Sequence, residues 1–416
     1  MANLDTNPYK GVRDFYPEDK YVQKWMFNKL REVVESFGYV EYDASPLEPA
    51  ELYKAKSGKE IVNEQTYTFT DRGDREVTLR PEMTPTVARM VAGKRRDLAF
   101  PLRWYSIPNL FRYERPQKGR LREHYQLNVD IFGEEGVNAD VEILLVSSKI
   151  LKAFGAKDSD FEIRVSNRKL LNEIYEKLGL DDEGKNNLSK LLDKKAKMED
   201  KEYKEKALEI LGSNEKISEL ERLLEESVNS EYIKPLIDSL NKMGVENIKA
   251  DISIVRGFDY YNGMVFEVYD TNPENNRSMF GGGRYDGLTK LFENENIPAI
   301  GFGMGDVTLL DFLKSRDLAP KYKSSADLFI ATIEEIYIEK AEELAEVLRE
   351  KGLNVEINIG DKKIGDQIGI ADKKDIPYVL VLGEEEMSSK VYKVKKLESG
   401  EEKELSLDDI PEFVRS

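Results

Sequence analysis

The spacing of hydrophobic residues in the first third of the chain predicts both helices and strands. Within residues 24–37 the apolar positions recur at helical spacing, which predicts an amphipathic helix ending at Gly38. An extended segment closed by Pro46 follows. The stretch QTYTFTDRGDREVTLR (65–80) alternates apolar and polar residues around DRGD, and residues 103–133 repeat that form around a basic loop. Both patterns predict antiparallel strand pairs.

The middle of the chain combines further strands with a segment of different character. Residues 252–269 and 280–304 are expected to be strands with glycine-rich bends. Residues 167–248 are rich in Lys and Glu with leucines at helical intervals, which predicts a helical insertion, and its charge runs are typical of solvated helix faces. Antiparallel strands flanked by helices predict an α+β domain over residues 1–325.

The last hundred residues alternate between strand-like and helix-like runs. They follow a plausible linker at 314–326 and predict a small α/β domain, residues 326–416, with a mainly parallel sheet. The expected order is strand, helix, strand, helix, strand at 327–333, 338–351, 353–359, 361–374 and 378–383.

Composition narrows the possible chemistry. The 416 residues contain no cysteine and a single histidine, His124, so thiolate chemistry is excluded and a zinc site or histidine-based triad is not expected. A metal would be held by carboxylates and substrate phosphates, which favours Mg²⁺. The net charge of −17 opposes nonspecific nucleic-acid binding but leaves local contacts possible. His124 itself is either catalytic or a surface or strand-end residue.

Membrane insertion is not expected from the sequence. The apolar runs, such as YVLVL at 378–382, have the length of strands, and the polar start MANLDTNPYK lacks the apolar core of a signal peptide. These features predict a cytoplasmic protein.

Against this acidic background, RYERPQKGRLREHYQ (112–126) carries four arginines and a lysine within eleven positions. Arg112 lies at a predicted strand end, and Glu114 is two residues on, so their side chains leave the same face. An arginine on a rigid strand suits a phosphate, which its planar fork can grip. The alternative for the loop beyond Arg112 is a solvated basic turn.

Three other segments combine polar side chains with bends. VRGFDYYNG (255–263) suggests either a ligand site or a structural ion pair beside two packed tyrosines, and FGGGRYDGL (280–288) lets backbone approach a ligand or strand closely. In LRPEMTP (79–85), Glu82 and Thr84 are expected on one side of an extended run, where they would seat an ammonium group.

Taken together and in this order, these segments resemble the histidyl-tRNA synthetase family of class II aminoacyl-tRNA synthetases over essentially the full length. The matching pieces are GVRDFYPED, LRPEMT, FRYERPQKGRLREHYQ, VRGFDYYN, GGGRYDGL and, toward the C-terminus, IGIADKKDIPYVLVLGEEE. The resemblance implies a class II catalytic domain, its helical insertion and a C-terminal anticodon-binding domain. It also implies a homodimer whose interface includes the segment around Pro46.

The resemblance implies that the basic segment binds two polyanions, ATP and the acceptor end of histidine tRNA. Arg112 falls where the family grips the α-phosphate, and Glu114 where adenine is read. Arg115 and Gln117 fall where the extra guanine at the 5′ end of histidine tRNA is recognised. Mg²⁺ would accompany ATP.

The resemblance also implies a histidine site. Glu82, Thr84 and Gln126 match positions that hold the substrate's α-amino group. Asp130 and Tyr261 match those that bind the imidazole nitrogens, with aspartate where family members more often carry glutamate. A carboxylate there would accept from an imidazole N–H and help to reject analogues that lack it.

Arg256 would contact the substrate carboxylate and the α-phosphate, and Tyr260 is counted with the histidine-binding residues. Arg112 and Arg256 would thus be the catalytic pair. The implied reaction is in-line attack of the histidine carboxylate on the α-phosphate, release of pyrophosphate, and transfer to the 3′ end of tRNA. This is the reaction of a histidine–tRNA ligase, and it requires no protein nucleophile.

One segment departs from the family pattern. GFGMGDVTLL (301–310) has Val307 and Thr308 where the third class II motif carries a Glu-Arg pair whose arginine contacts ATP. The departure implies a weaker ATP site, or another cation in that place. It also keeps open a second hypothesis, a non-catalytic relative that serves as a regulatory subunit in histidine biosynthesis.

Overall fold

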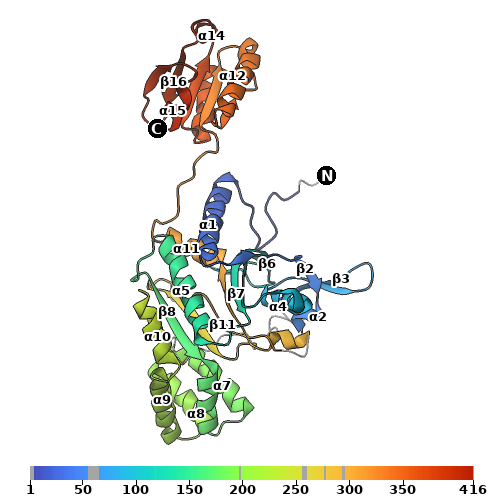
Figure 1. Cartoon of the computed structure of the whole chain (residues 1–416), viewed down its shortest axis with the longest axis vertical. Helices are drawn as coiled ribbons and strands as arrows, with labels where there is room; N and C mark the ends of the chain where they lie inside the picture. Colours follow the sequence, from blue (N-terminus) through green and yellow to red (C-terminus); the bar gives the residue numbers. More distant parts are fainter. Residues whose placement is uncertain are drawn as a thin grey trace. The chain divides into compact units, whose positions relative to one another are not determined.

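The computed structural model divides into two compact units (Figure 1). The first contains Met1–Asp14 and Lys24–Ala319, and the second contains Phe15–Gln23 and Pro320–Ser416. The structure describes residues 4–54, 65–117, 119–195, 198–254, 260–275, 278–292 and 296–415.

The first unit is built on a nine-stranded sheet within the part of the chain that the structure describes. Its pairings are antiparallel except for β1 with β5 and β8 with β9. In spatial order the strands are β1 (Val40–Glu41), β5 (Leu102–Ser106), β7 (Glu123–Phe132), β12 (Ala299–Gly305), β11 (Ser278–Arg284), β10 (Met264–Asp270), β8 (Phe161–Asn167) and β9 (Ile248–Ala250), with β6 (Asn109–Phe111) also paired to β7.

The two faces of β7 differ because its side chains alternate in polarity. Leu127, Val129 and Ile131 point into the main core, where they meet helices α1 (Pro17–Ser36) and α5 (Val137–Ala153). Gln126 and Asp130 lie on the other face. There the sheet is partly covered by α4 (Thr84–Lys94), whose Val87 and Val91 pack with Phe132.

A small second sheet and two further helical elements border that polar face. Strands β2 (Leu47–Pro49), β4 (Glu76–Leu79) and β3 (Tyr67–Thr70) form a three-stranded antiparallel sheet beside α2 (Glu51–Lys54) and α4. The hairpin predicted at 65–80 is therefore confirmed. Short helices η1 (Arg95–Asp97) and η3 (Leu288–Leu291) both pack against α4.

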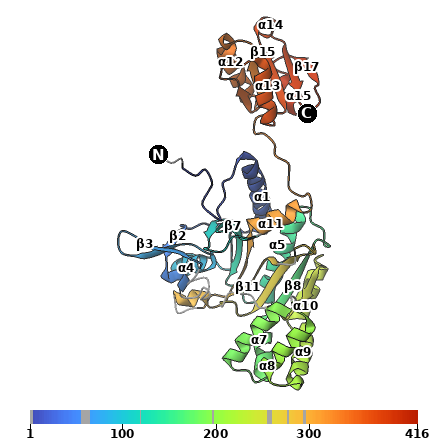
Figure 2. The ribbon, with the colours of Figure 1, turned by 180° about the vertical axis from the view of Figure 1, so that it is seen from behind.

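The predicted helical insertion is confirmed, with five helices in its described residues that gather at one end of the first unit (Figures 1 and 2). Leucines at helical spacing, such as Leu188 and Leu220, are buried between them. Side chains cap the N-termini of three of these helices, Asn167 at α6, Asp181 at α7 and Ser213 at α9. The helices are α6 (Arg168–Lys177), α7 (Asp182–Lys194), α8 (Asp200–Leu211), α9 (Asn214–Val228) and α10 (Ile233–Lys242).

The second unit has a five-stranded sheet within its described residues. Leu328 and Ile330 of strand β13 (Leu328–Thr332) pack under α12, while Phe329 and Ala331 pack under α13, so both faces of that strand are buried. The strand order is β14 (Val355–Ile357), β13 (Leu328–Thr332), β15 (Tyr378–Leu382), β16 (Tyr392–Lys396) and β17 (Glu402–Leu405). The helical elements are η4 (Glu335–Tyr337), α12 (Ile338–Glu350), α13 (Ile364–Lys373), α14 (Glu384–Ser389) and α15 (Ile410–Arg415).

Most predicted elements are present, and three of the differences lie outside the candidate site. The first helix begins at Pro17, because the polar turn Pro17–Lys20 joins the apolar pattern at its N-terminus. Residues 252–253 form a turn, and the strand expected from 252 begins at Met264. The sheet of the second unit is half antiparallel, because β16 and β17, which were not predicted from the sequence, pair as a hairpin with β15. Among the described helices, none combines the length and the apolar character required to span a bilayer.

Candidate active site

A cavity of about 110 Å³ opens on the polar face of the main sheet. It brings together residues from β6–β7, from the start of α4, and from β11 and β12. Seven of the residues expected at the substrate site line it: Glu82, Thr84, Arg112, Gln126, Asp130, Tyr260 and Tyr261. The other lining residues are Asn128, Gly281, Tyr285, Gly301, Phe302 and Gly303.

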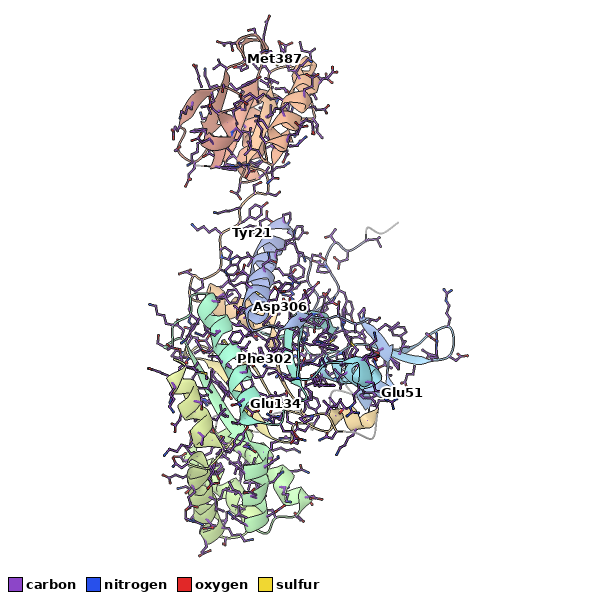
Figure 3. All side chains as sticks on the ribbon, in the orientation of Figure 1. Tyr21, Glu51, Glu134, Phe302, Asp306 and Met387 are labelled. Atoms are coloured by element: carbon purple, nitrogen blue, oxygen red, sulfur yellow. The ribbon has the colours of Figure 1, made fainter. Side chains whose placement is uncertain are left out.

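Glycines leave room for the polar side chains of β7. Gly301 pairs with Asp130 across β12 and β7, and a Cβ on Gly301 would lie 2.2 Å from the Asp130 Oδ1 atom. A Cβ on Gly303 would lie 2.5 Å from the Gln126 Nε2 atom. Because no real contact is that short, Asp130 and Gln126 can lie across the sheet only if both β12 positions are glycine. Gly301 and Gly303 therefore leave space for the pocket on one face of β12. Phe302 between them (labelled in Figure 3) packs into the main core.

Asp130 is one of two buried carboxylates in the pocket. Its side chain accepts a hydrogen bond of 2.5 Å from the Tyr285 hydroxyl, and the residue is 4 % exposed. Burial raises the pKa of Asp130 to about 7, although the Tyr285 hydrogen bond opposes the shift. The ionised carboxylate would gain from a further donor, since a buried charge needs hydrogen bonds.

Glu82, the second buried carboxylate of the pocket, lies just before α4. Its Oε2 atom accepts from the Tyr260 hydroxyl at 2.9 Å, and the residue is 2 % exposed. The backbone carbonyl of Glu82 faces the Tyr53 hydroxyl at 3.4 Å. The extended run expected at 79–85 is wrong, because α4 begins at Thr84 with Pro85 in its first turn. Glu82 and Thr84 nevertheless line the same cavity.

Gln126 and Asn128 continue the polar row of β7. The Gln126 Nε2 atom donates to Asn128 Oδ1 at 2.6 Å, which orients the two amides toward each other. Two-residue spacing along the strand places Gln126, Asn128 and Asp130 on one face. Asn128 was not predicted from the sequence, although this alternation with buried Leu127 and Val129 could have revealed it.

Arg112 follows directly after β6 and lines the cavity. Its Nε donates to the carbonyl of Pro81 at 2.8 Å, which anchors the guanidinium beside Glu82. His124 is the second residue of β7, so it lies at a strand end, one of the two places expected for it. Burial and the charges of Arg112 and Arg13 lower the pKa of His124 to about 3, so its imidazole is neutral at pH 7.

The remaining predicted residues of the basic segment lie on the loop between β6 and β7, outside the cavity lining. Arg115 and Gln117 are exposed, and Gln117 forms an isolated bridge with Arg120. The Glu114 carboxylate, less exposed, lies 3.6 Å from the Arg120 guanidinium. Arg256 lies outside the described residues.

The glycines of β11 were expected from the sequence to let backbone approach a ligand or another strand closely, but Tyr285 was not predicted to belong to the site. Gly283 pairs with Gly301, and Gly281 pairs with Gly303, so two rows of glycine cross the sheet beneath the cavity. The signal was the run of three glycines in FGGGR and the alternation of glycine in GFGMG, which both place glycines two residues apart. Which strands would pair, and so bring the two repeats together, was not readable from the sequence.

Comparisons with known proteins agree with this arrangement. A family model described as Histidyl-tRNA synthetase matches residues 11–308, and one described as Anticodon binding domain matches residues 327–416. A histidine–tRNA ligase of Leptospira biflexa is 43 % identical over 411 residues, covering 95 % of this chain and 94 % of the relative. That of Thermoplasma volcanium is 38 % identical, covering 97 % of each. The crystal structure of histidyl-tRNA synthetase from Nostoc shares the fold, with a TM-score of 0.82, 22 % identity and 99 % of each chain covered.

The two family matches identify the class of the protein as an aminoacyl-tRNA synthetase, with the polar pocket on the largely antiparallel sheet of its catalytic unit. Within that class, the chain belongs to the histidyl-tRNA synthetase family. The regulatory-subunit hypothesis is not favoured, because curated relatives at 35–43 % identity over nearly the full length are histidine–tRNA ligases.

Proposed function

We propose that this chain attaches L-histidine to the 3′ end of histidine tRNA through a histidyl-adenylate intermediate formed from ATP. The observation that carries the proposal is the pair of buried carboxylates, Asp130 and Glu82, in one small cavity beside Arg112. Such a cavity suits a small amino acid with two cationic or N–H donor ends and a carboxylate directed outward.

In this proposal Asp130 and Tyr261 bind the imidazole, while Glu82, Thr84 and Gln126 hold the α-amino group. Tyr285 orients the Asp130 carboxylate, so the second oxygen of Asp130 can accept from the imidazole N–H. Tyr260 similarly orients Glu82. An analogue without the N–H would leave the second oxygen of the buried Asp130 carboxylate without that donor, which is costly.

The chemical step needs two negatively charged groups to approach. The histidine carboxylate attacks the α-phosphorus of ATP, the bond to the β-phosphate oxygen breaks, and pyrophosphate leaves. Arg112, which lines the cavity, would offset charge at the α-phosphate, with Arg256 as its proposed partner and Glu114 at the adenine. The tRNA 3′-terminal hydroxyl then attacks the histidyl carbonyl and releases AMP.

Mg²⁺ would enter with ATP, where it neutralises phosphate charge. Within the described residues no group of three or more acidic or histidine side chains could hold a metal ion, so the phosphates of ATP themselves would supply most of its ligands. We further propose a cytoplasmic homodimer, in which Arg115 and Gln117 contact the tRNA acceptor end and residues 326–416 contact the anticodon.

Histidine-dependent exchange between ATP and pyrophosphate tests the proposal. Purified protein should catalyse exchange with histidine and not with alanine, phenylalanine or histidinol, which lack the side-chain donor or the carboxylate. A chain ending at residue 325 should retain exchange if 1–325 is an independent catalytic domain, and it should charge tRNA poorly. Histidine binding without any exchange at saturating ATP and magnesium would refute the synthetase proposal.

A further inference from the structure

A charged contact outside the cavity joins the N-terminal segment to the start of α11 (Asp306–Lys314). Arg13 Nη2 donates to Asp306 Oδ2 at 2.8 Å, and Asp306 Oδ1 accepts from the backbone N–H of Tyr125 at 3.0 Å. The Asp306 side chain is 4 % exposed and that of Arg13 is 22 % exposed. A buried carboxylate at the beginning of α11 (Asp306 is labelled in Figure 3) thus orients a cation that reaches the surface.

The segment that carries Arg13 is tied to the base of the basic loop. The carbonyl of Gly11 accepts from the backbone N–H of Arg122 at 2.7 Å and of Glu123 at 3.3 Å. A Cβ on Gly11 would lie 2.8 Å from the Arg122 Cγ atom, so the two chain segments are in close contact. Arg122 also donates to the Tyr9 hydroxyl at 3.0 Å. Arg13 is therefore held beside the loop by backbone as well as by charge.

Arg13 lies at the Arg112 end of the pocket. The backbone N–H of Arg112 donates to the carbonyl of Arg122 at 2.8 Å, and the N–H of Arg122 donates to the carbonyl of Gly11, two residues before Arg13, at 2.7 Å. His124 precedes Gln126 by two residues on the same face of β7, on the side away from Asp130. A histidine bound with its imidazole at Asp130 directs its carboxylate, and hence the attached nucleotide, toward this end.

Thr308, at the position where the family pattern has an arginine, cannot supply a charge there. Its hydroxyl donates back to the carbonyl of Met279 at 2.9 Å and faces that of Gly305 at 3.2 Å. A Cβ on loop residue Gly119 would lie 3.5 Å from the Thr308 methyl, so Thr308 adjoins the same loop as Arg13. ATP carries several negative charges, and a chain of net charge −17 must offset them locally.

We infer that Arg13, positioned by Asp306, binds the β- and γ-phosphates of ATP. A guanidinium can engage a carboxylate on one edge of its planar fork and a phosphate on another. The inference rests on the proposed function, in which Arg112 acts at the α-phosphate. Arg13 is thus the cation that compensates for the missing arginine at position 308.

The test compares Arg13→Ala with Arg103→Ala in the exchange assay. Arg103 is a matched control, because it also forms a part-buried pair, with Glu142, but on β5 and against α5 on the helix-covered side of the sheet. Arg13→Ala should raise the ATP KM roughly tenfold, as expected for a lost charge-assisted contact. Histidine affinity and AMP affinity should equal those of the control, because neither ligand contains the β- and γ-phosphates.

Three results for Arg13→Ala would overturn the inference. The first is an ATP KM equal to that of Arg103→Ala. The second and third are a loss of AMP affinity or of histidine affinity as large as the loss of apparent ATP affinity. Absence of exchange in the unmodified protein would instead refute the proposed function, so the two failures are distinguishable. If Arg13→Ala does not fold, Arg13→Lys carries the test. Lysine keeps the charge but not the fork, so the ATP KM should rise roughly threefold, and an unchanged KM would be contradictory.

Discussion

Asp130 and Glu82 in the pocket are 4 % and 2 % exposed, whereas Arg115 and Gln117 on the adjoining loop are exposed. Each pocket carboxylate is fixed by a tyrosine hydroxyl from a distant part of the chain. The loop instead makes local contacts, such as the one between Gln117 and Arg120. Buried groups can discriminate a small substrate, because leaving them without a hydrogen-bond partner is costly. A large polyanion can instead be bound by charged side chains on the surface, which adjust to it.

The largest effect should follow from filling the glycine floor of the pocket. Gly301→Ala would place a Cβ where the Asp130 carboxylate lies, so Asp130 must move. We expect histidine-dependent exchange to fall roughly 100-fold, because a displacement of about 1 Å in a binding group can cost that much. Gly93→Ala is the control, since nothing lies within 4 Å of the position that its Cβ would take. Comparable exchange in the two variants would show that the pocket tolerates this displacement.

Asp130→Asn separates charge from shape within the pocket. Histidine affinity should fall by roughly 1–3 kcal/mol, because a charge-assisted hydrogen bond becomes neutral, and ATP affinity should not change. The measurement is calorimetric titration of each ligand. Unaltered histidine affinity would contradict the assignment of Asp130 to the imidazole.

The same variant tests the pH dependence of the pocket. Since the pKa of Asp130 is raised to about 7, the carboxylate is ionised above that pH and protonated below it. Histidine affinity in the unmodified protein should therefore decline as pH falls from 8 to 6, and part of this decline should be absent in Asp130→Asn. Identical pH profiles would remove Asp130 as the titrating group.

The loop offers the opposite test. Arg115→Ala combined with Gln117→Ala should leave exchange nearly intact and slow aminoacylation of histidine tRNA roughly tenfold, the value of about one to two lost hydrogen bonds. Both side chains lie outside the cavity lining, which is why adenylate formation should be spared. Equal losses in the two assays would erase the distinction between pocket and loop.

The smallest effect is expected for Tyr285→Phe. This change removes the hydroxyl that lowers the pKa of Asp130, so that pKa should rise further above its ordinary range. Histidine affinity at pH 7 should drop roughly two- to fivefold, as for a neutral hydrogen bond, and should recover when the pH is raised. Titration at pH 7 and pH 8.5 measures both effects, and a loss that is independent of pH would assign Tyr285 a packing role instead.

The sequence alone determined much of the local structure and most of the pocket residues. Helical spacing and strand alternation are set by neighbouring side chains, so α1, the β3–β4 hairpin and the helical insertion could be predicted. Prediction from the local pattern was wrong where tertiary contacts decide the structure. At Thr84, for example, α4 replaces the expected extended run and packs on Phe132. The local pattern also did not reveal β16 and β17. These short polar strands form because β16 pairs with β15 and β17 pairs with β16.

The tertiary structure decided which of the predicted residues meet. The sequence separation between Asp130 and Tyr285, or between Arg13 and Asp306, is too large for any local pattern to reveal their contacts. The pairing of β7 with β12 and of β12 with β11 creates the glycine floor, and that pairing depends on burying the opposite, apolar face of the same strands. The chemical character of the site residues could therefore be predicted from the sequence. That these residues meet in one cavity depends on the packing of the sheet.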